Sequence, residues 1–436
     1  MNRMPLQTPP RWWSPKLSPR WIRFWRVFQR HAQFRQQRLV EVEVRGLQNL
    51  RGALDRGCGV LVAPNHSAHA DCHALVRASE QAGCPFHFMV AWQVFQRGNW
   101  FRRTALRHYG CFSVDREGTD HRAMRQAVEI LQSSPHPLVI FPEGEVYHRN
   151  ERITPFREGP AAIAQLAARR AERPVVCVPC SIHYEYLDDP TEELLGVMDR
   201  LERAVFWRPR PDLPLEKRIY RLAEALLGLK EYEHLGRTTE GTVPERIAVL
   251  QEQVLKGIER RYGIEAGDAT VPERVKALRK AAIERLEDLD PNDPARAEAE
   301  RDLDDLFFVV QLLSYPGDYV AQRPSLERIA ETLDKFEEDV LGKSTATIRG
   351  TRKAIVTFGE PFPVEKGRDR KASGPGLTRK LEERVQKLLD EEAEESRMML
   401  RNPKSGTNSK SGIPNVPNPT RPRRVVQLAA GETFRI

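Results

Sequence analysis

The sequence predicts an α/β protein: an open mixed sheet flanked by helices, interrupted by a large all-helical insertion. Two observations predict this fold. Short apolar runs rich in β-branched residues, such as 59–63 and 174–179, indicate buried strands, and turns or helical patterns follow them. About 175 residues between Pro179 and Ile355 then carry helical periodicity and are rich in Glu, Arg, Leu and Ala.

The length and composition fit a globular protein with more than one part. The 436 residues suffice for two or three domains, and 30% of them are charged. The end of the chain is rich in Pro, Asn, Ser and Gly, too poor in apolar groups to form a core. We expect a basic aromatic segment in 1–40, the first part of the α/β core in 41–190, the helical insertion in 191–345, the closing strand and helix of the core in 346–400, and a disordered tail in 401–436.

A candidate catalytic pair lies where the strand at 59–63 ends. His66 follows the strand-ending residues Pro64 and Asn65, and a helical pattern begins beyond Asp71. Positions five apart on a regular helix point about 140° away from each other. His66 must therefore lie in the loop or at the helix start if Asp71 is to reach its ring. In that geometry Asp71 orients the imidazole, and His66 acts as general base toward a substrate hydroxyl.

Two other interpretations of these residues stay open. A histidine beside a carboxylate can be purely structural. Alternatively, four ligand-type side chains within eight residues, His66, His69, Asp71 and His73, could hold zinc and activate a water. Their spacing resembles the H-x-H-x-D-H of metallo-β-lactamases, but two of its three intervals differ by one residue. No later motif completes such a centre, so we expect no metal here, and a metal-dependent hydrolase is the weakest alternative.

Three further segments bring polar groups or a turn to a strand end. Residues 109–116 form a short strand that closes on Arg116, and residues 137–144 form another that ends in a Pro-Glu-Gly turn. A third apolar strand ends at Pro179. Open α/β sheets build their ligand crevices at such strand ends. We therefore expect these segments to surround one site.

Taken in order, these segments resemble the glycerolipid acyltransferase family, which contains lysophosphatidic-acid and glycerol-3-phosphate acyltransferases. The family's four signature blocks are a His-x4-Asp, a Gly-x-Φ-Φ-Φ-x-Arg, a Phe-Pro-Glu-Gly and a proline-ended apolar strand. The matching blocks here are 66–71, 110–116, 141–144 and 175–179, with family-like first and last strands at 41–46 and 355–361.

The resemblance implies transfer of a fatty acyl group from a thioester, on coenzyme A or acyl carrier protein, to a hydroxyl of a lysophospholipid or glycerol phosphate, as in a 1-acylglycerol-3-phosphate O-acyltransferase. It implies His66 as general base and Asp71 as its orienter. The acyl thioester is a co-substrate, and no cofactor or metal is expected. The residues that the resemblance assigns to substrate binding are Arg116, which would contact the acceptor phosphate, Pro142, Glu143, Gly144 and Pro179.

The segment after Gly144 departs from the family pattern. Family members usually continue with Thr-Arg-Ser, whose arginine also binds the phosphate, whereas Glu-Val-Tyr follows here. Arg149, Arg152 or Arg157 could compensate, or the acceptor is not a lysophosphatidic acid. The departure also keeps open an alternative from another class, a catalytically inactive lipid-binding or scaffolding protein on the same fold.

The amino terminus predicts contact with an anionic membrane surface. Residues 1–40 hold nine Lys or Arg and no acid, while the whole chain has a net charge of +8. From Arg20 to Leu39, aromatic residues recur at helical spacing among arginines, a pattern typical of helices in the headgroup layer. No window reaches the ~18 apolar residues that span a bilayer.

Other interpretations of this segment are an organellar transit peptide or a helix packed on its own domain. No RNA-binding signature accompanies the charge, so we expect no nucleic-acid partner. We expect a cytoplasmic protein, peripheral on the inner face of the cell membrane.

Overall fold

The structure is a computed structural model that describes residues 11–401 except 117–119, 266, 268, 291 and 367–369. The expected disordered tail lies outside the described residues from position 402 onward. The chain divides into two compact units, Met1–Ala393 and Glu394–Ile436. Of the second unit, the structure describes residues 394–401, the end of helix α15 (Arg370–Arg401), where Arg397 and Glu394 form an ion pair at 3.0 Å.

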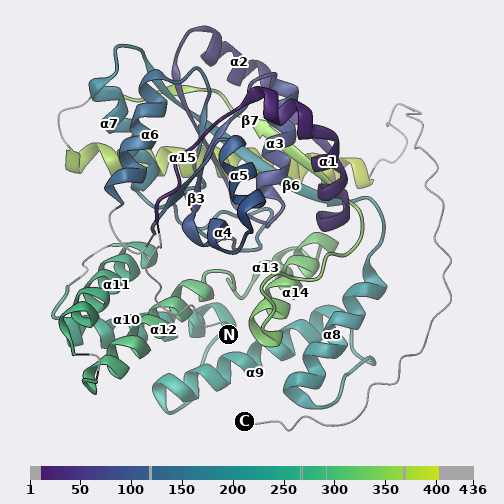
Figure 1. Cartoon of the computed structure of the whole chain (residues 1–436). Coiled ribbons are helices and arrows are strands. Elements are labelled where there is room, and N and C mark those ends of the chain that lie inside the picture. Colours follow the sequence, from purple (N-terminus) through teal and green to yellow (C-terminus); the bar gives the residue numbers. More distant parts are fainter. Residues whose placement is uncertain are drawn as a thin grey trace. The chain divides into compact units, whose positions relative to one another are not determined.

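Within the described residues, eight strands form one mixed sheet in the order β1-β7-β6-β2-β5-β3-β4, with β8 paired to β6 (Figure 1). β7 runs antiparallel to β6 and parallel to β1, and β2 to β5 pair in parallel, so the predicted open mixed sheet is confirmed. The strands are β1 (Leu39–Arg45), β2 (Gly59–Pro64), β3 (His87–Ala91), β4 (Cys111–Val114), β5 (Leu138–Val139), β6 (Val175–Tyr186), β7 (Arg352–Phe358) and β8 (Phe362–Pro363).

Helices cover both faces of this sheet. Because successive strand side chains point to opposite faces, Val60 and Val62 of β2 pack into one apolar core, and Leu61 and Ala63 pack into another. The first face carries α2 (Leu47–Asp55), α3 (Asp71–Ala82) and α4 (Trp92–Gln96); the second carries α6 (His121–Ser133), α7 (Gly159–Arg170) and α15. Burial on both faces explains why β2 reads as a continuous apolar run.

The basic aromatic segment forms the predicted helix, α1 (Pro19–Gln37), which begins where the Ser18 hydroxyl accepts a hydrogen bond from the Trp21 amide at 3.3 Å. One side packs on the domain: Trp21 stacks on His108 with ring centroids 4.8 Å apart, and Trp25 contacts Phe101 of α5 (Trp100–His108) at 5.4 Å. None of the described helices combines the length and the apolar character needed to cross a membrane.

Helices follow β6, as predicted. Two of the inserted helices, α10 and α11, begin with the same five residues, Thr-Val-Pro-Glu-Arg, which form a capping box with proline in the first turn. The helices after β6 are α8 (Thr191–Phe206), α9 (Leu215–Leu235), α10 (Val243–Tyr262), α11 (Val271–Asp288), α12 (Ala295–Leu312), α13 (Tyr319–Gln322) and α14 (Leu326–Leu341). Within the described residues this insertion is all-helical.

The inserted helices form two apolar cores of their own. The end of α9 packs with α10, α11 and α12 around buried residues such as Leu250 and Leu306. The first half of α9 packs with α8 and α14 around residues such as Leu201 and Leu333. The apolar run 306–312 near the end of α12 lies largely inside the first of these cores.

Two buried asparagines continue the hydrogen bonding of β6 beyond the end of β2. The Asn65 amide accepts from Ile182 N at 2.7 Å and donates to Ile182 O at 3.1 Å. Asn150 makes the same pair of bonds with Tyr184, at 2.7 and 2.8 Å. Since buried backbone groups need partners, these amides replace a neighbouring strand. They fix the loop after β2 and the segment after β5 beside β6.

Candidate active site

His66 lies in the loop between β2 and α3, and Asp71 is the first residue of α3. His66 Nδ1 is 2.8 Å from Asp71 Oδ2. The side chain of His66 is 17% exposed, whereas that of Asp71 is completely buried. The expected geometry is present: the loop position of His66 lets a residue five positions later reach its ring.

Asp71 accepts hydrogen bonds from three sides. Besides the His66 ring, Ala68 N donates to Oδ2 at 3.0 Å, and the Tyr184 hydroxyl donates to Oδ1 at 2.8 Å. Burial and the nearby Asp71 raise the pKa of Tyr184 well above its ordinary value, so its hydroxyl stays protonated. A carboxylate can only accept. A proton shared between an ionised Asp71 and the imidazole therefore lies on Nδ1, which leaves the lone pair of the neutral ring on Nε2.

Glu143 supports the backbone of the same loop. Its carboxylate accepts from His66 N at 2.6 Å, from Thr154 N at 2.9 Å and from the Thr154 hydroxyl. Burial raises the pKa of Glu143, and these hydrogen bonds oppose that rise. The Phe141 ring also stacks on His66, with centroids 4.0 Å apart. Glu143 thus contributes by positioning His66, and a direct contact with substrate stays a prediction.

Gly144 lets an arginine lie against the Pro-Glu-Gly turn. Its φ is +80°, and a Cβ atom there would lie 2.5 Å from Nε of Arg157. Arg157 N also donates to the carbonyl of Pro142 at 2.9 Å. The predicted Pro179 is buried within β6, paired with Ala63 of β2, and its contact with substrate stays a prediction.

Arg116 binds the residues at the end of the same turn. Its guanidinium donates to Gly144 O and to Glu145 Oε1, both at 2.6 Å. Burial alone would raise the pKa of Glu145, but Arg116 and Arg157 outweigh it and hold that pKa below its ordinary value. The acid that departs from the family pattern is therefore ionised and bound to the arginine expected to hold phosphate.

A hollow, here called the cationic hollow, lies between the core and the inserted helices. Two of its four cationic side chains come from the core and two from α11, beside an apolar wall. Its lining residues are Arg116, Glu145, Arg157, Pro272, Val275, Lys276, Arg279, Phe307 and Val310. His66 lies close enough to add to the lowering of the pKa of Glu145. The charge of the hollow favours an anion, and an apolar wall adjoins that charge.

Only one of the three arginines offered as substitutes for the family's arginine lies in this hollow, namely Arg157. Arg149 donates to Leu313 O at 3.1 Å, and Arg152 pairs with Asp318 at 3.0 Å. Both therefore connect the segment after β5 to the insertion.

The four residues weighed as zinc ligands do not gather at one point. His66 and Asp71 bond to each other, while His69 contacts Glu338 of α14 at 3.0 Å. His73 lies on α3, where burial lowers its pKa to about 4. Among the described residues, no metal-ligand group combines these four.

Sequence reasoning missed three residues of this site. Tyr184 reaches Asp71 from β6, 113 positions away, and no local pattern marks it. Lys276 and Arg279 read as ordinary polar positions of an amphipathic helix. The resemblance offered no counterpart for them because the insertion lies beyond its four blocks.

Residues 41–183, about a third of the chain, match the sequence model of the family described as Acyltransferase. No curated protein matches the chain. The matched segment carries both His66 and Asp71 and every predicted substrate-binding residue. This match agrees with the resemblance found in the sequence and supports acyl transfer as the general activity of the segment.

The hydroxyl of Tyr184 should matter for turnover more than for binding. Tyr184→Phe removes one donor from Asp71 and leaves the ring in place. We expect kcat for acyl transfer to fall about 10-fold with the KM of both substrates unchanged, because Asp71 then orients His66 less firmly. Thioester cleavage measured at varied substrate concentrations separates the two constants. Tyr315→Phe is the matched control, since that buried hydroxyl donates to Asp339 at 2.7 Å within the insertion. Equal losses in both variants would contradict this role.

Proposed function

We propose that this domain moves a fatty acyl group from a thioester of coenzyme A or acyl carrier protein to a hydroxyl of a phosphorylated glycerolipid acceptor, with a lysophospholipid favoured over glycerol phosphate. The observation that supports this most is the His66 ring, oriented by the buried Asp71 at 2.8 Å, beside the cationic hollow. No resident cofactor takes part in the proposed reaction.

In the proposed mechanism His66 is the general base. Nε2 takes the proton of the acceptor hydroxyl as the hydroxyl oxygen attacks the thioester carbonyl and forms the new C–O bond. Asp71 stabilises the resulting imidazolium through Nδ1. The tetrahedral intermediate then collapses, the C–S bond breaks, and the imidazolium returns its proton to the departing thiolate. The products are the acylated acceptor and the free thiol of the carrier.

The acceptor headgroup would bind in the cationic hollow. Four cationic side chains face a single acid there, which favours an anion. Because Glu145 already pairs with the Arg116 guanidinium, a phosphate would share that guanidinium with Glu145. It would also contact Arg157, Lys276 and Arg279. The apolar wall of Val275, Phe307 and Val310 offers a surface for the acceptor's acyl chain. This wall is the reason to favour a lysophospholipid.

A substrate panel tests the enzymatic role. Purified protein is incubated with labelled acyl-CoA or acyl carrier protein as donor. The acceptors are lysophosphatidate, other lysophospholipids, glycerol 3-phosphate and neutral alcohols. We expect product with the wild type and a loss of at least about 100-fold with His66→Ala. The exposed His121 supplies the control, since His121→Ala should retain activity. Absence of product with every donor and acceptor would instead support the inactive lipid-binding scaffold.

The insertion's share in acceptor binding is tested on α11 itself. Lys276 lines the cationic hollow, whereas Lys280, one turn later, pairs with Glu284 at 3.6 Å on the exposed surface. We expect Lys276→Ala to raise the KM for a phosphorylated acceptor about 10-fold, the value of one charge-assisted hydrogen bond. Lys280→Ala should leave that KM unchanged. An unchanged KM for the phosphorylated acceptor in Lys276→Ala would exclude this hollow as the headgroup site.

We also propose that α1 binds an anionic membrane surface and that the protein is peripheral on the cytoplasmic face of the cell membrane. Phe24, Val27 and Phe28 are 63–70% exposed on α1, and Trp100 of the adjoining α5 is 76% exposed. Exposed arginines, such as Arg23 and Arg26, alternate with these apolar groups. This combination suits the headgroup layer of anionic lipid.

Vesicle binding tests this surface. We expect the double variant Phe24→Ser/Phe28→Ser to bind phosphatidylglycerol vesicles at least about 10-fold more weakly in a sedimentation assay, because two exposed rings no longer insert. Leu229→Ser/Tyr232→Ser is the matched control, since these side chains are 63% and 70% exposed on α9. Undiminished binding of the α1 variant would contradict the proposal.

A further inference from the structure

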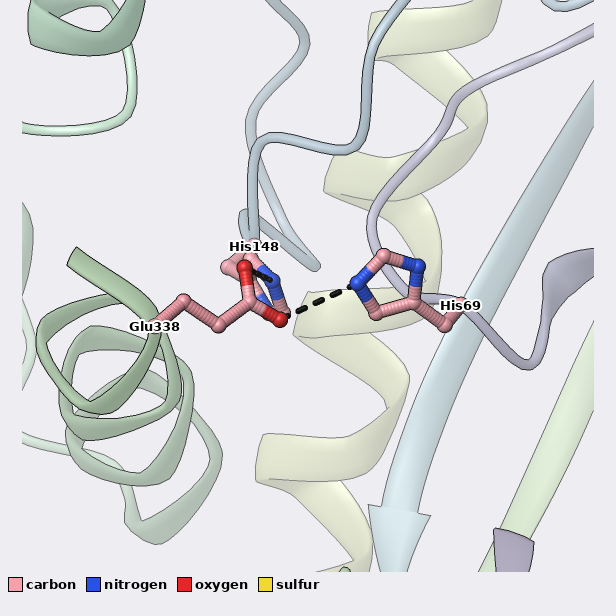
Figure 2. Close-up of side chains that lie close together, drawn as sticks. All are labelled: His69, His148 and Glu338. Carbon is pink, nitrogen blue, oxygen red and sulfur yellow. Dashed lines mark hydrogen bonds and ion pairs between the residues drawn. The ribbon is translucent and has the colours of Figure 1, made fainter. Parts of the chain in front are cut away.

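Two histidines and a carboxylate, distant in sequence, meet beside the candidate active site. His69 belongs to the loop after β2, His148 to the segment after β5, and Glu338 to α14 (Figure 2). His69 Nε2 lies 3.0 Å from Glu338 Oε1, and His148 Nε2 lies 3.2 Å from Oε2. Among the described residues, these three form the one His/Cys/Asp/Glu group whose ligand atoms all lie within 4.8 Å of one another.

The surroundings hold these side chains in place. His148 is 5% exposed and adopts a left-handed backbone with φ of +53°, which is uncommon for a residue with a side chain. Residues held in such conformations cluster at functional sites. Glu338 also accepts from Ala346 N at 3.0 Å, which fixes the carboxylate between the two rings.

We propose that His69, His148 and Glu338 bind one Zn²⁺ ion. Two imidazole nitrogens and one carboxylate oxygen form a common three-residue ligand set for zinc, with the fourth position left to water. A tetrahedral zinc about 2.1 Å from each ligand needs ligand atoms about 3.4 Å apart. Each imidazole lies beside a different oxygen of the Glu338 carboxylate, at 3.0 and 3.2 Å, and one ligand atom from each residue lies within 4.8 Å of the others, so a small adjustment of the side chains would bring the three to this spacing. Magnesium and calcium prefer oxygen ligands, so the two imidazoles select against them.

Two of the three ligands border solvent or a hollow. The His69 side chain is 36% exposed. His148 also lines a second hollow, which runs past the loop at Ser67 and Ala68. Three acidic residues of α14, Glu327, Glu331 and Asp334, contribute to its wall beside Arg352.

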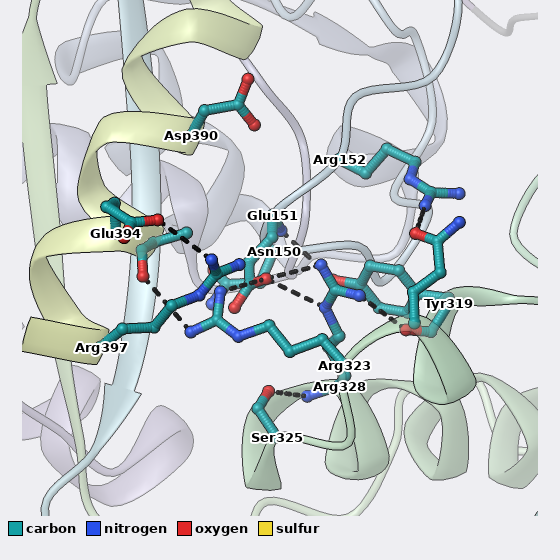
Figure 3. Close-up of polar contacts among 12 residues, drawn as sticks. Asn150, Glu151, Arg152, Tyr319, Arg323, Ser325, Arg328, Asp390, Glu394 and Arg397 are labelled. Carbon is teal, nitrogen blue, oxygen red and sulfur yellow. Dashed lines mark hydrogen bonds and ion pairs between the residues drawn. The ribbon is translucent and has the colours of Figure 1, made fainter. Parts of the chain in front are cut away.

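Polar contacts that need no metal also hold the segment after β5, which carries His148, against the region of α14, which carries Glu338 (Figure 3). Glu151 accepts from Arg323 at 3.0 Å and from Arg328 at 2.9 Å, and Asn150 N donates to Glu331 at 3.0 Å. These bonds join the segment after β5 to α14 and to the turn that precedes it. They keep His148 and Glu338 near each other before an ion arrives.

The zinc ion would help to position the loop that carries His66. His69 follows His66 by three residues, and Tyr147, the neighbour of His148, donates its amide to His66 O at 3.2 Å. An ion held by these ligands would connect α14 to segments on both sides of the His66 ring. The ion would take no part in the proposed acyl transfer.

Zinc binding is measured on the full chain after chelator treatment and dialysis. Titration against a chromophoric zinc indicator should give one equivalent of Zn²⁺ per chain, and elemental analysis should count the same. We expect His148→Gln and Glu338→Gln to weaken binding at least about 100-fold, since losing a direct ligand exceeds the 10–100-fold effect of a supporting residue. Zinc should also raise the unfolding temperature of the wild type but not of His148→Gln.

Two controls keep this test independent of folding and of the proposed acyl transfer. His69→Gln changes the most exposed ligand and should lose zinc without unfolding the chain. His66→Ala should lose acyl transfer and keep zinc. Less than half an equivalent of zinc, or equal zinc affinity in the wild type and the ligand variants, would overturn the site and leave Glu338 as a carboxylate that joins two histidines by hydrogen bonds.

Discussion

The buried carboxylate of Asp71 constrains how the loop after β2 is built. A charge removed from water must be paired or hydrogen-bonded, and this one receives the His66 ring, the Ala68 amide and the Tyr184 hydroxyl. Those bonds fix the direction of the imidazole and the path of the loop at once. Glu143 and Asn65 then hold the loop's backbone against the turn after β5 and against β6.

The helical insertion contributes to the candidate site from outside the family-matched segment. α11 supplies Lys276 and Arg279 to the cationic hollow, and α12 supplies Phe307 and Val310 to its apolar wall. α14 supplies Glu338, which faces His69 and His148. In the proposed acceptor site, Arg157 and the two basic residues of α11 would take the place of the arginine that the family pattern has after Gly144.

Much of the fold and part of the candidate site could be predicted from sequence because their signals are local. β2 and the start of β6 are apolar runs rich in valine, which predict buried strands. The helices of the insertion can be predicted from helical periodicity and from capping residues at their starts. The His66–Asp71 pair could be predicted because its two residues are only five positions apart. Tyr184 could not be predicted this way, because its contact depends on how β6 lies beside the loop after β2. The same holds for His148 and Glu338, which are 190 positions apart and meet only after α14 packs on the core.

In the proposed reaction, the His66 ring and the cationic hollow form one active site for a phosphorylated acceptor. The most direct measurement is a crystal structure with lysophosphatidate and an unreactive acyl-thioester analogue bound together. We expect the phosphate between Arg116, Arg157 and Lys276, with the acceptor hydroxyl within about 3.2 Å of His66 Nε2. A phosphate bound outside the hollow, or a hydroxyl that the His66 ring cannot reach, would contradict it.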